Sequence, residues 1–328
     1  MNTLKTAAAS AAAGLAIALA CHAGIAQTRP YRIAVMPFGL PEYMSKWSAQ
    51  MQDHPMVKSG KVKLTVLDGK FDPLVQTNQM ETVITEKYDA VIFAPMDFNA
   101  ATAPIAKATA AKIPVVGSVT RADSDKLFAY VGTNDVEGGR LIAEHLVKQL
   151  GGKGNVVILE GPIGNSPQLL RQKGIQQVLA ANPGIKVIAD KTANWSRAEG
   201  LTVMENWLSA YGGRINGVIA HNDEMALGAI EAMKAKKIDP KTIPVVAIDG
   251  IPDGQRAVKD GNLFTLYKDA SAEGQGAMDL AVRAVTGAAY KPAAEVWSNG
   301  LAWRDGTARQ YDVPWIALTP DNVGKYLR

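Results

Sequence analysis

The sequence predicts an α/β protein made of two similar, doubly wound parallel-sheet domains of the Rossmann-like type. Short β-branched runs alternate with longer amphipathic stretches from Tyr31 onward, which is the pattern of βαβ units. These runs are apolar at consecutive positions, so helices must cover both faces of each sheet. The alternation starts again after Asn134, and 328 residues exceed what one hydrophobic core usually serves.

The expected elements follow one another in the same order in both halves. In the first half, candidate strands cover 31–37, 61–68, 90–95, 113–119 and 128–132, and candidate helices cover 72–86 and 100–111. In the second half, candidate strands cover 155–161, 185–193, 217–223 and 244–250, and candidate helices cover 135–150, 169–181, 197–211 and 224–234. A last helix over 272–286 precedes a strand-like segment at 295–297 and a tail with a short helix from about Thr319.

The N-terminus predicts export. Residues 1–26 combine a lysine-bearing start, an Ala/Leu/Ile stretch and small residues near the end, which is typical of a signal peptide cleaved after Ala26. A transmembrane anchor is the alternative, but the apolar run is shorter than the roughly 20 residues that span a bilayer. Lipidation at Cys21 is a second alternative, and Ala18-Leu19-Ala20 before it is a poor lipoprotein site. We expect a periplasmic protein without a lipid anchor.

Composition excludes several functional classes. Cys21 is the only cysteine and leaves with the signal peptide, so the mature chain has no thiol for a disulfide, a metal site or a nucleophile. The formal charge of +4 is spread without a basic block, which argues against nucleic-acid binding. The four histidines show no metal-binding spacing. We expect no metal and no cofactor.

Polar residues that end the apolar runs are the candidate site, because ligands of open α/β sheets meet the carboxyl ends of strands. They are Asp97, Thr120-Arg121, Asn222-Asp223 and Asp249. No nucleophile and base are paired among them, so an enzyme is not expected. Carboxylate, amide and guanidinium groups suit a neutral polyol, whose hydroxyls both donate and accept hydrogen bonds.

Some of these residues have simpler interpretations. Asp135 and Asp223 each precede a helical pattern and are expected to be helix caps. Asn222 and Asp249 fit turns, and Trp195 fits the core as well as a sugar-covering ring. Neither GxGxxG nor a P-loop occurs, and Gly138-Gly139 lies inside a helical pattern, where close packing is expected rather than phosphate contact.

Several longer motifs resemble the periplasmic ribose-binding protein family, which shares its fold with LacI-type regulators. They are NDEMALGAIEAMK at 222–234, VVAIDGIPDGQRAVKDG at 245–261, GTNDVEGGRLIAEHL at 132–146 and GNSPQLLRQKGIQQVL at 164–179. The resemblance covers essentially the whole mature chain. It implies a type I periplasmic-binding-protein architecture with a hinge, and lobes formed by 28–133 with 270–298 and by 134–269 with 299–328.

The resemblance also implies ligand-binding positions. The sugar-binding arginine of the family falls on Arg171, its pocket aromatic on Trp195, its amide on Asn222 and its carboxylate on Asp249. A polar residue after the next strand falls on Asp269. In the first half, Arg121 carries over without an acidic neighbour. Tyr43, Glu42 or Trp47 stands in for the family's aromatic loop in uncertain register, and Tyr43 is the residue we expect to bind the ligand.

The function implied is that of a monomeric substrate-binding component of an ABC importer, which closes around a sugar or polyol and delivers it to a membrane permease. The alternative is a periplasmic sensor, of the autoinducer-2 or chemotaxis type, that presents a sugar-like molecule to a receptor. A LacI-type regulator would need an N-terminal helix-turn-helix, and a secreted enzyme would need a catalytic pair; neither is found in the sequence.

Overall fold

The computed structural model describes residues 29–298 and 300–327, and the chain from Tyr31 onward forms one compact unit. The expected signal peptide at 1–26 and the lipidation question at Cys21 lie outside the described residues. Within the described part, no helix is long and apolar enough to span a membrane.

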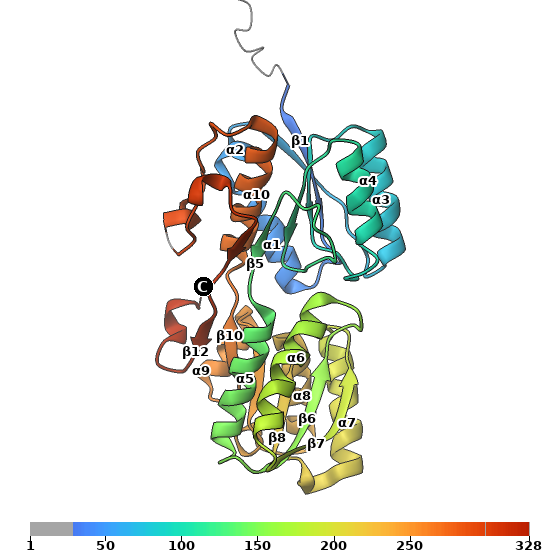
Figure 1. Ribbon diagram of the computed structural model, residues 1–328. Coiled ribbons are helices and arrows are strands. Elements are labelled where there is room, and N and C mark those ends of the chain that lie inside the picture. The colour runs from blue at the N-terminus through green and yellow to red at the C-terminus, as the bar shows by residue number, and fades with distance from the viewer. Residues whose placement is uncertain (1–28, 299, 328) are drawn as a thin grey trace, which may run out of the picture. The chain divides into compact units, whose positions relative to one another are not determined.

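Two six-stranded sheets form the framework (Figure 1). The first has the order β11-β5-β4-β3-β1-β2 and is parallel throughout. Its strands are β1 (Tyr31–Met36), β2 (Val62–Val66), β3 (Ala90–Phe93), β4 (Val115–Ser118), β5 (Ala129–Gly132) and β11 (Gln310–Asp312). The second has the order β12-β10-β9-β8-β6-β7, with only β12 antiparallel. Its strands are β6 (Gly154–Glu160), β7 (Ile185–Thr192), β8 (Gly217–Ala220), β9 (Val245–Asp249), β10 (Phe264–Tyr267) and β12 (Ile316–Leu318).

Helices cover both faces of each sheet, as consecutive apolar strand positions require. The helices of the first sheet are α1 (Glu42–Gln52), α2 (Pro55–Lys58), α3 (Pro73–Thr85), α4 (Thr102–Ala110) and α10 (Ala270–Thr286). Those of the second are α5 (Asp135–Gln149), α6 (Ser166–Ala181), α7 (Arg197–Tyr211), α8 (Asp223–Ala235) and α9 (Pro252–Lys259). We call each sheet with its helices the first and the second lobe.

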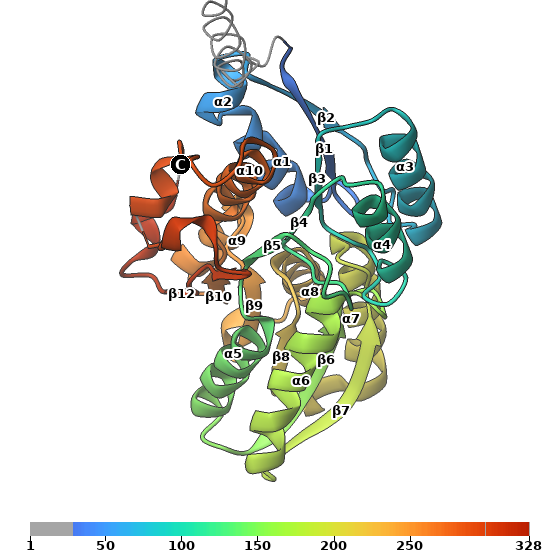
Figure 2. The same ribbon diagram turned by 45° about the horizontal axis from the view of Figure 1, so that its top comes forward.

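Helices lie on both faces of each sheet (Figure 2), and buried apolar side chains fill the space between sheet and helices. In the first lobe α3 and α4 contribute to one cluster, while α1 and α10 pack on the opposite face. In the second lobe α5 and α6 cover one face, and α7 and α8 cover the other. The doubly wound fold expected from the sequence is therefore confirmed.

Three short segments connect the lobes. The chain passes from β5 to α5 through 133–134, returns from β10 to α10 through 268–269, and crosses again from β11 to β12 through 313–315. The expected division put 299–328 with the second lobe, but β11 pairs with β5 in the first sheet, so the tail is shared between them. The rest of the division at 133/134 and 269/270 remains our proposal for the domain boundaries.

Several local expectations were wrong. Residues 295–298 form a 3-10 turn rather than a strand, and the short final helix is a 3-10 turn at Val323–Lys325. Asp135 and Asp223 are not caps: Asn134 caps α5 by accepting from Glu137 N–H, and Asn222 caps α8. The two aspartates are the first helical residues, so their carboxylates are free to turn inward, where Asp135 accepts from the Arg171 side chain and Asp223 accepts from Ile251 N–H.

Close packing of α5 against α6 depends on two glycines. A Cβ at Gly139 would lie 2.1 Å from the carbonyl oxygen of Arg171, and one at Gly174 would lie 2.0 Å from that of Val136. No side chain fits at either distance, so the two helix backbones are in direct contact. The expectation of packing at Gly138-Gly139 is confirmed, and the contact fixes where Arg171 lies.

Gly139→Ala should therefore destabilise the fold. An added methyl must push α6 away, which typically costs about 1–3 kcal/mol in a packed core. Urea unfolding would measure the loss in the free energy of unfolding. Gly213→Ala is the matched control, because a Cβ there meets nothing within 4 Å; a loss in this control as large as at Gly139 would contradict the packing argument.

Candidate functional site

A cavity lies where the carboxyl ends of strands from both sheets meet. The space between its walls is about 450 Å³ with the open mouth included. First-lobe residues that follow β1 and β4 line it together with second-lobe residues that follow β6 to β10. The lining residues are Phe38, Pro41, Tyr43, Met44, Val119, Thr120, Asn165, Pro167, Arg171, Trp195, Asn222, Glu224, Asp249, Ile251 and Lys268.

Arg171 is held rigidly in this cavity. It is 3 % exposed, and its Nε donates to Asp135 over 2.9 Å while Nη1 donates to the carbonyl of His221. Its Nη2 lies 4.0 Å from the Asp249 carboxylate, and the guanidinium carbon lies 5.7 Å from the Trp195 ring centroid. Because two of its nitrogens already have acceptors, only the edge that faces Asp249 remains available.

Asp249 ends β9 and is 8 % exposed. Among the described residues its carboxylate accepts no hydrogen bond, and its nearest cation is Arg171. Burial raises the pKa of Asp249 to about 6, although Arg171 and Lys268 oppose the shift. A buried carboxylate without a hydrogen bond has unused acceptor capacity, which a ligand could take up.

Asp223 lies behind Asp249 and serves the protein itself. Its carboxylate accepts from Ile251 N–H over 2.9 Å and from the Thr265 hydroxyl over 2.5 Å. Burial and the neighbouring Asp249 raise its pKa well above the ordinary value. Asp223 therefore supports the loop after β9 rather than the cavity surface.

Two further side chains bring unused hydrogen-bond donors to the cavity. The Asn222 oxygen accepts from Met225 N–H over 3.0 Å, which leaves its amide nitrogen without a bond among the described residues. The Trp195 ring is buried, and its Nε1 has no partner in the described chain. His221 beside it is neutral at neutral pH, since burial, and secondarily Arg171, lowers its pKa to about 3.

The backbone is strained at three cavity residues. Val119, Trp195 and Asp249 have φ values of 65°, 60° and 130°. Side-chain-bearing residues rarely occupy this region, least of all a β-branched valine. Such conformations persist where the surrounding structure forces them, and they concentrate at ligand sites.

Lys268 reaches the cavity from the segment that joins the lobes. It is 2 % exposed; its Nζ lies 3.5 Å from Glu273 and 4.7 Å from the Tyr43 ring centroid. The Tyr43 hydroxyl donates to the same Glu273 carboxylate over 2.7 Å. Burial, with Lys268 opposing it, raises the pKa of Glu273. Lys268 thus joins a buried first-lobe carboxylate to the second-lobe wall.

The structure brings together Tyr43, Arg171, Trp195, Asn222 and Asp249. It places Arg121 and Asp269 elsewhere. Arg121 lies over the Tyr130 ring, 3.9 Å from its centroid, and contacts Gln310 in a separate surface groove. The Asp269 carboxylate caps α10 by accepting from Ser271 and Ala272 N–H.

Sequence reasoning missed other lining residues for identifiable reasons. Lys268 directly precedes Asp269, so the polar position at the end of β10 was placed one residue late. Asn165 follows β6 and fits the strand-end rule used for the other strands, which could have found it. Phe38, Met44 and Val119 are apolar and carry no sequence signal that separates a cavity wall from a core.

The described residues contain no group of three or more His, Cys, Asp or Glu side chains arranged to hold a metal. Asp97, another polar residue expected at a strand end, accepts from the N–H groups of Asn99 and Ala100 and does not line the cavity.

Known proteins are similar along most of the chain. A sequence-family profile described as periplasmic binding protein domain matches residues 33–289. A xylitol-binding protein of Mycolicibacterium smegmatis is 36% identical over 259 residues, which cover 78% of this chain and 73% of that protein. A putative rhizopine-binding protein of Rhizobium meliloti is 36% identical over 249 residues, 74% of this chain and 80% of that protein. A solute-binding protein of an ABC transporter from Bacillus halodurans, solved with bound myo-inositol, superposes with a TM-score of 0.81 at 29% identity, covering 91% of this chain and 98% of that one.

The raised pKa of Asp249 predicts that the free energy of unfolding of the ligand-free protein depends on pH. Between about pH 4 and pH 6 the folded state keeps a proton that the unfolded state has released, so stability falls as the pH rises through this range. Asp249→Asn should therefore be about 3 kcal/mol more stable than the parent at pH 7.5, and about equal to it at pH 4. Urea unfolding without ligand measures both. Asp269→Asn, which keeps a capping oxygen, controls for loss of a carboxylate outside the cavity; an Asp249→Asn protein less stable at both pH values would contradict the prediction.

Proposed function

Since the chain belongs to the periplasmic binding protein family, we propose that it captures a small sugar or sugar-like polyol and delivers it to the membrane permease of an ABC importer. Members of this family are substrate-binding proteins rather than enzymes. The observation that carries the proposal is the unused hydrogen-bonding capacity of Asp249, Asn222 and Arg171 around one cavity. We further propose that the protein works as a periplasmic monomer.

Hydroxyl groups match this set of atoms. The Asp249 carboxylate can accept from two adjacent hydroxyls, while Arg171 Nη2 and the Asn222 amide nitrogen can donate to their oxygens. The Trp195 ring offers an apolar surface for the C–H face of a sugar. One relative is named a xylitol-binding protein, and a similar solved structure contains bound myo-inositol; both molecules are polyols, which supports the same ligand class here.

The charges at the cavity argue against an anionic ligand. Arg171 is paired with Asp135, Lys268 with Glu273, and Glu224 accepts from Arg197 over 2.7 Å. Of the carboxylates that line the cavity in the described chain, only Asp249 accepts no hydrogen bond. An anionic group would meet this carboxylate in a buried site whose nearby cations are already paired, at considerable cost.

Closure of the lobes around the ligand is the proposed mechanism of capture. The three short connections allow a hinge. Across the cavity the loop after β6 contacts first-lobe loops: Asn165 Nδ2 donates to the Met96 carbonyl over 2.7 Å, Phe98 N–H donates to the Gly164 carbonyl, and Arg121 N–H donates to the Ser166 hydroxyl. These hydrogen bonds would hold the closed form and break on opening.

A ligand screen tests the proposal. A compound present at about 100 times its dissociation constant stabilises the folded protein by about 2.7 kcal/mol. We expect a thermal shift from at least one pentose, hexose, polyol or inositol.

Asp249→Asn should lower the affinity for that compound by roughly 100-fold in calorimetry, while Asp269→Asn should keep it. Asp249 is chosen over Arg171, because truncating Arg171 would strip the buried Asp135 of its partner and destabilise the fold. No shift with any polyhydroxylated compound would contradict the proposal.

Ser166→Ala tests closure separately from ligand contact. Ser166 does not line the cavity, and its hydroxyl accepts from Arg121 N–H over 2.6 Å across the lobes. Loss of this bond, worth about 1 kcal/mol, should weaken ligand binding roughly five-fold and enlarge the empty protein in small-angle X-ray scattering. Ser124→Ala removes a similar serine acceptor inside the first lobe and should change neither. Equal affinities for both variants and the parent would show that the hydrogen bond between Arg121 and Ser166 does not contribute to closure.

A further inference from the structure

We propose that the ligand is a deoxy-sugar of the 6-deoxyhexose type, with a methyl group in place of a hydroxymethyl group. This inference rests on the proposed function and specifies its ligand. It follows from an asymmetry between the two walls of the cavity, one apolar and one polar.

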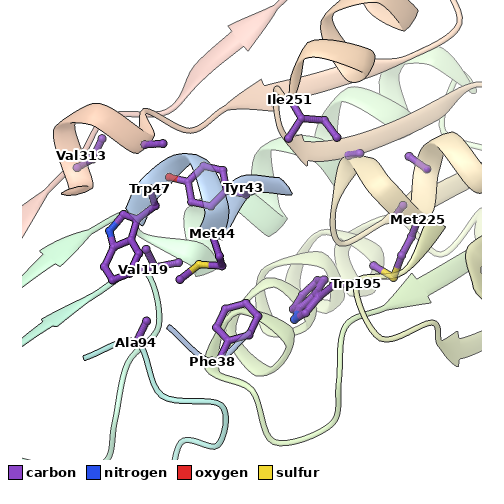
Figure 3. Close-up of a cluster of buried hydrophobic side chains, with 14 of the residues drawn as sticks. Phe38, Tyr43, Met44, Trp47, Ala94, Val119, Trp195, Met225, Ile251 and Val313 are labelled. Atoms are coloured by element: carbon purple, nitrogen blue, oxygen red, sulfur yellow. The ribbon is translucent and has the colours of Figure 1, made fainter. Parts of the chain in front are cut away.

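The first-lobe wall is apolar. Phe38, Pro41, Met44 and Val119 form it, and Figure 3 shows Phe38, Met44 and Val119 beside one another, with Trp195 of the second lobe next to Phe38. Phe38 is fixed by an edge-on contact with Phe71, with ring centroids 5.6 Å apart. Proline contributes no N–H group, so these residues present no side-chain hydrogen-bonding group.

The polar residues of the same wall have already used their donors. The Tyr43 hydroxyl donates to Glu273 over 2.7 Å, and the Thr120 hydroxyl donates to the Pro95 carbonyl over 2.8 Å. Arg121, which could have supplied donors after β4, lies over Tyr130 outside the cavity. The two hydroxyl oxygens can still accept a hydrogen bond. The side-chain donor on this side is the Lys268 ammonium group, which lies above Tyr43 and is paired with Glu273, whereas Phe38, Met44 and Val119 offer none.

The opposite wall has several groups with unused capacity. They come from the second lobe: Asn165 Oδ1, Arg171 Nη2, Trp195 Nε1, Asn222 Nδ2 and the Asp249 carboxylate. Asn165 Oδ1 and Trp195 Nε1 are buried and have no partner in the described chain. A ligand that satisfies these groups must turn its hydroxyls toward them.

Hydroxyls on the far side of such a ligand would meet the apolar wall. A hexose carries hydroxyls around its whole ring and on its hydroxymethyl group, so a fully hydroxylated sugar would place one against Phe38, Met44 or Val119, whose side chains give it no hydrogen-bond donor. That loss weakens binding by roughly ten-fold or more. A methyl group at the same place packs against Phe38, Met44 and Val119 instead. The cavity thus favours a sugar with one hydroxyl-bearing side and one hydrocarbon side.

Matched pairs of sugars test this. Calorimetry on the mature protein would compare D-galactose with D-fucose, L-galactose with L-fucose, L-mannose with L-rhamnose, and D-glucose with 6-deoxy-D-glucose, each pair differing by one hydroxyl. In the pair that binds most tightly, the deoxy member should bind at least ten-fold more tightly. The inference is overturned if the hydroxylated member of every binding pair binds as tightly or more tightly, or if none of the pairs binds.

Variants of the apolar wall link the preference to these residues. Val119→Thr and Met44→Gln keep side-chain size and add a polar group, and each should reduce the deoxy preference at least three-fold. Val66→Thr on β2, 38 % exposed, is the matched control and should leave the preference unchanged. Thermal melting of each variant shows whether it is folded. Because two positions are changed separately, the test can still be made if one of the variants does not fold. An unchanged preference in both folded wall variants would overturn the assignment to this wall.

The outcomes separate the two proposals. If the wider screen finds a polyol ligand but the deoxy members have no advantage, the deoxy-sugar inference fails and capture of a polyol stands. If no polyhydroxylated compound stabilises the protein, the proposed function fails, and the inference that rests on it fails too.

Discussion

The buried ion pair between Arg171 and Asp135 is the interaction on which the candidate site depends. Both charges are almost fully buried, and such a pair is stable only when its geometry is fixed. Arg171 has a second acceptor in the His221 carbonyl, while Asp135 Oδ2 has no hydrogen bond among the described residues. The contact between Gly139 and the Arg171 backbone brings α5 and α6 close enough for this. Asp135 is available because Asn134, rather than Asp135, caps α5. Small residues in two helices therefore determine which edge of a guanidinium faces Asp249.

Several features around this pair lower the stability of the ligand-free protein. Asp249 is buried as a carboxylate without a hydrogen bond, and its backbone and those of Val119 and Trp195 are strained. Each feature costs folding free energy, which the cores on both faces of each sheet must offset. A ligand that supplies the missing hydrogen bonds would recover part of this cost. The same groups can thus weaken the empty protein and stabilise the liganded one.

Much of this organisation could be predicted from the sequence, because it depends on periodicity and on strand ends. The repeated βαβ pattern gave the two sheets, and the polar residues after β8 and β9, with Arg171 and Trp195 from the family resemblance, converge on one cavity. The predicted cavity residues were wrong where a shift of one residue along the chain turns the side chain in a different direction. Lys268 faces the cavity and Asp269 caps a helix, although they are neighbours. Arg121 follows the right strand but stacks on Tyr130, a tertiary contact that no local pattern reveals. The tail strands β11 and β12 are three residues long, too short for a periodic signal.

Lys268 shows how the connection between lobes and the cavity can act together. Its backbone N–H donates to the Asp249 carbonyl over 3.1 Å, while its ammonium group lies beside Glu273 and above Tyr43 in the first lobe. Any rotation of the lobes about 268–269 must move the ammonium group relative to Glu273 or move Asp249 with it. Glu273 Oε1 has no hydrogen bond among the described residues, so this buried cluster is only partly satisfied. A partly satisfied ionic cluster has no single strongly preferred arrangement. If the proposed closure occurs about 268–269, a ligand held by Asp249 would act directly on that segment, and the proposed hinge and the cavity would form one physical unit.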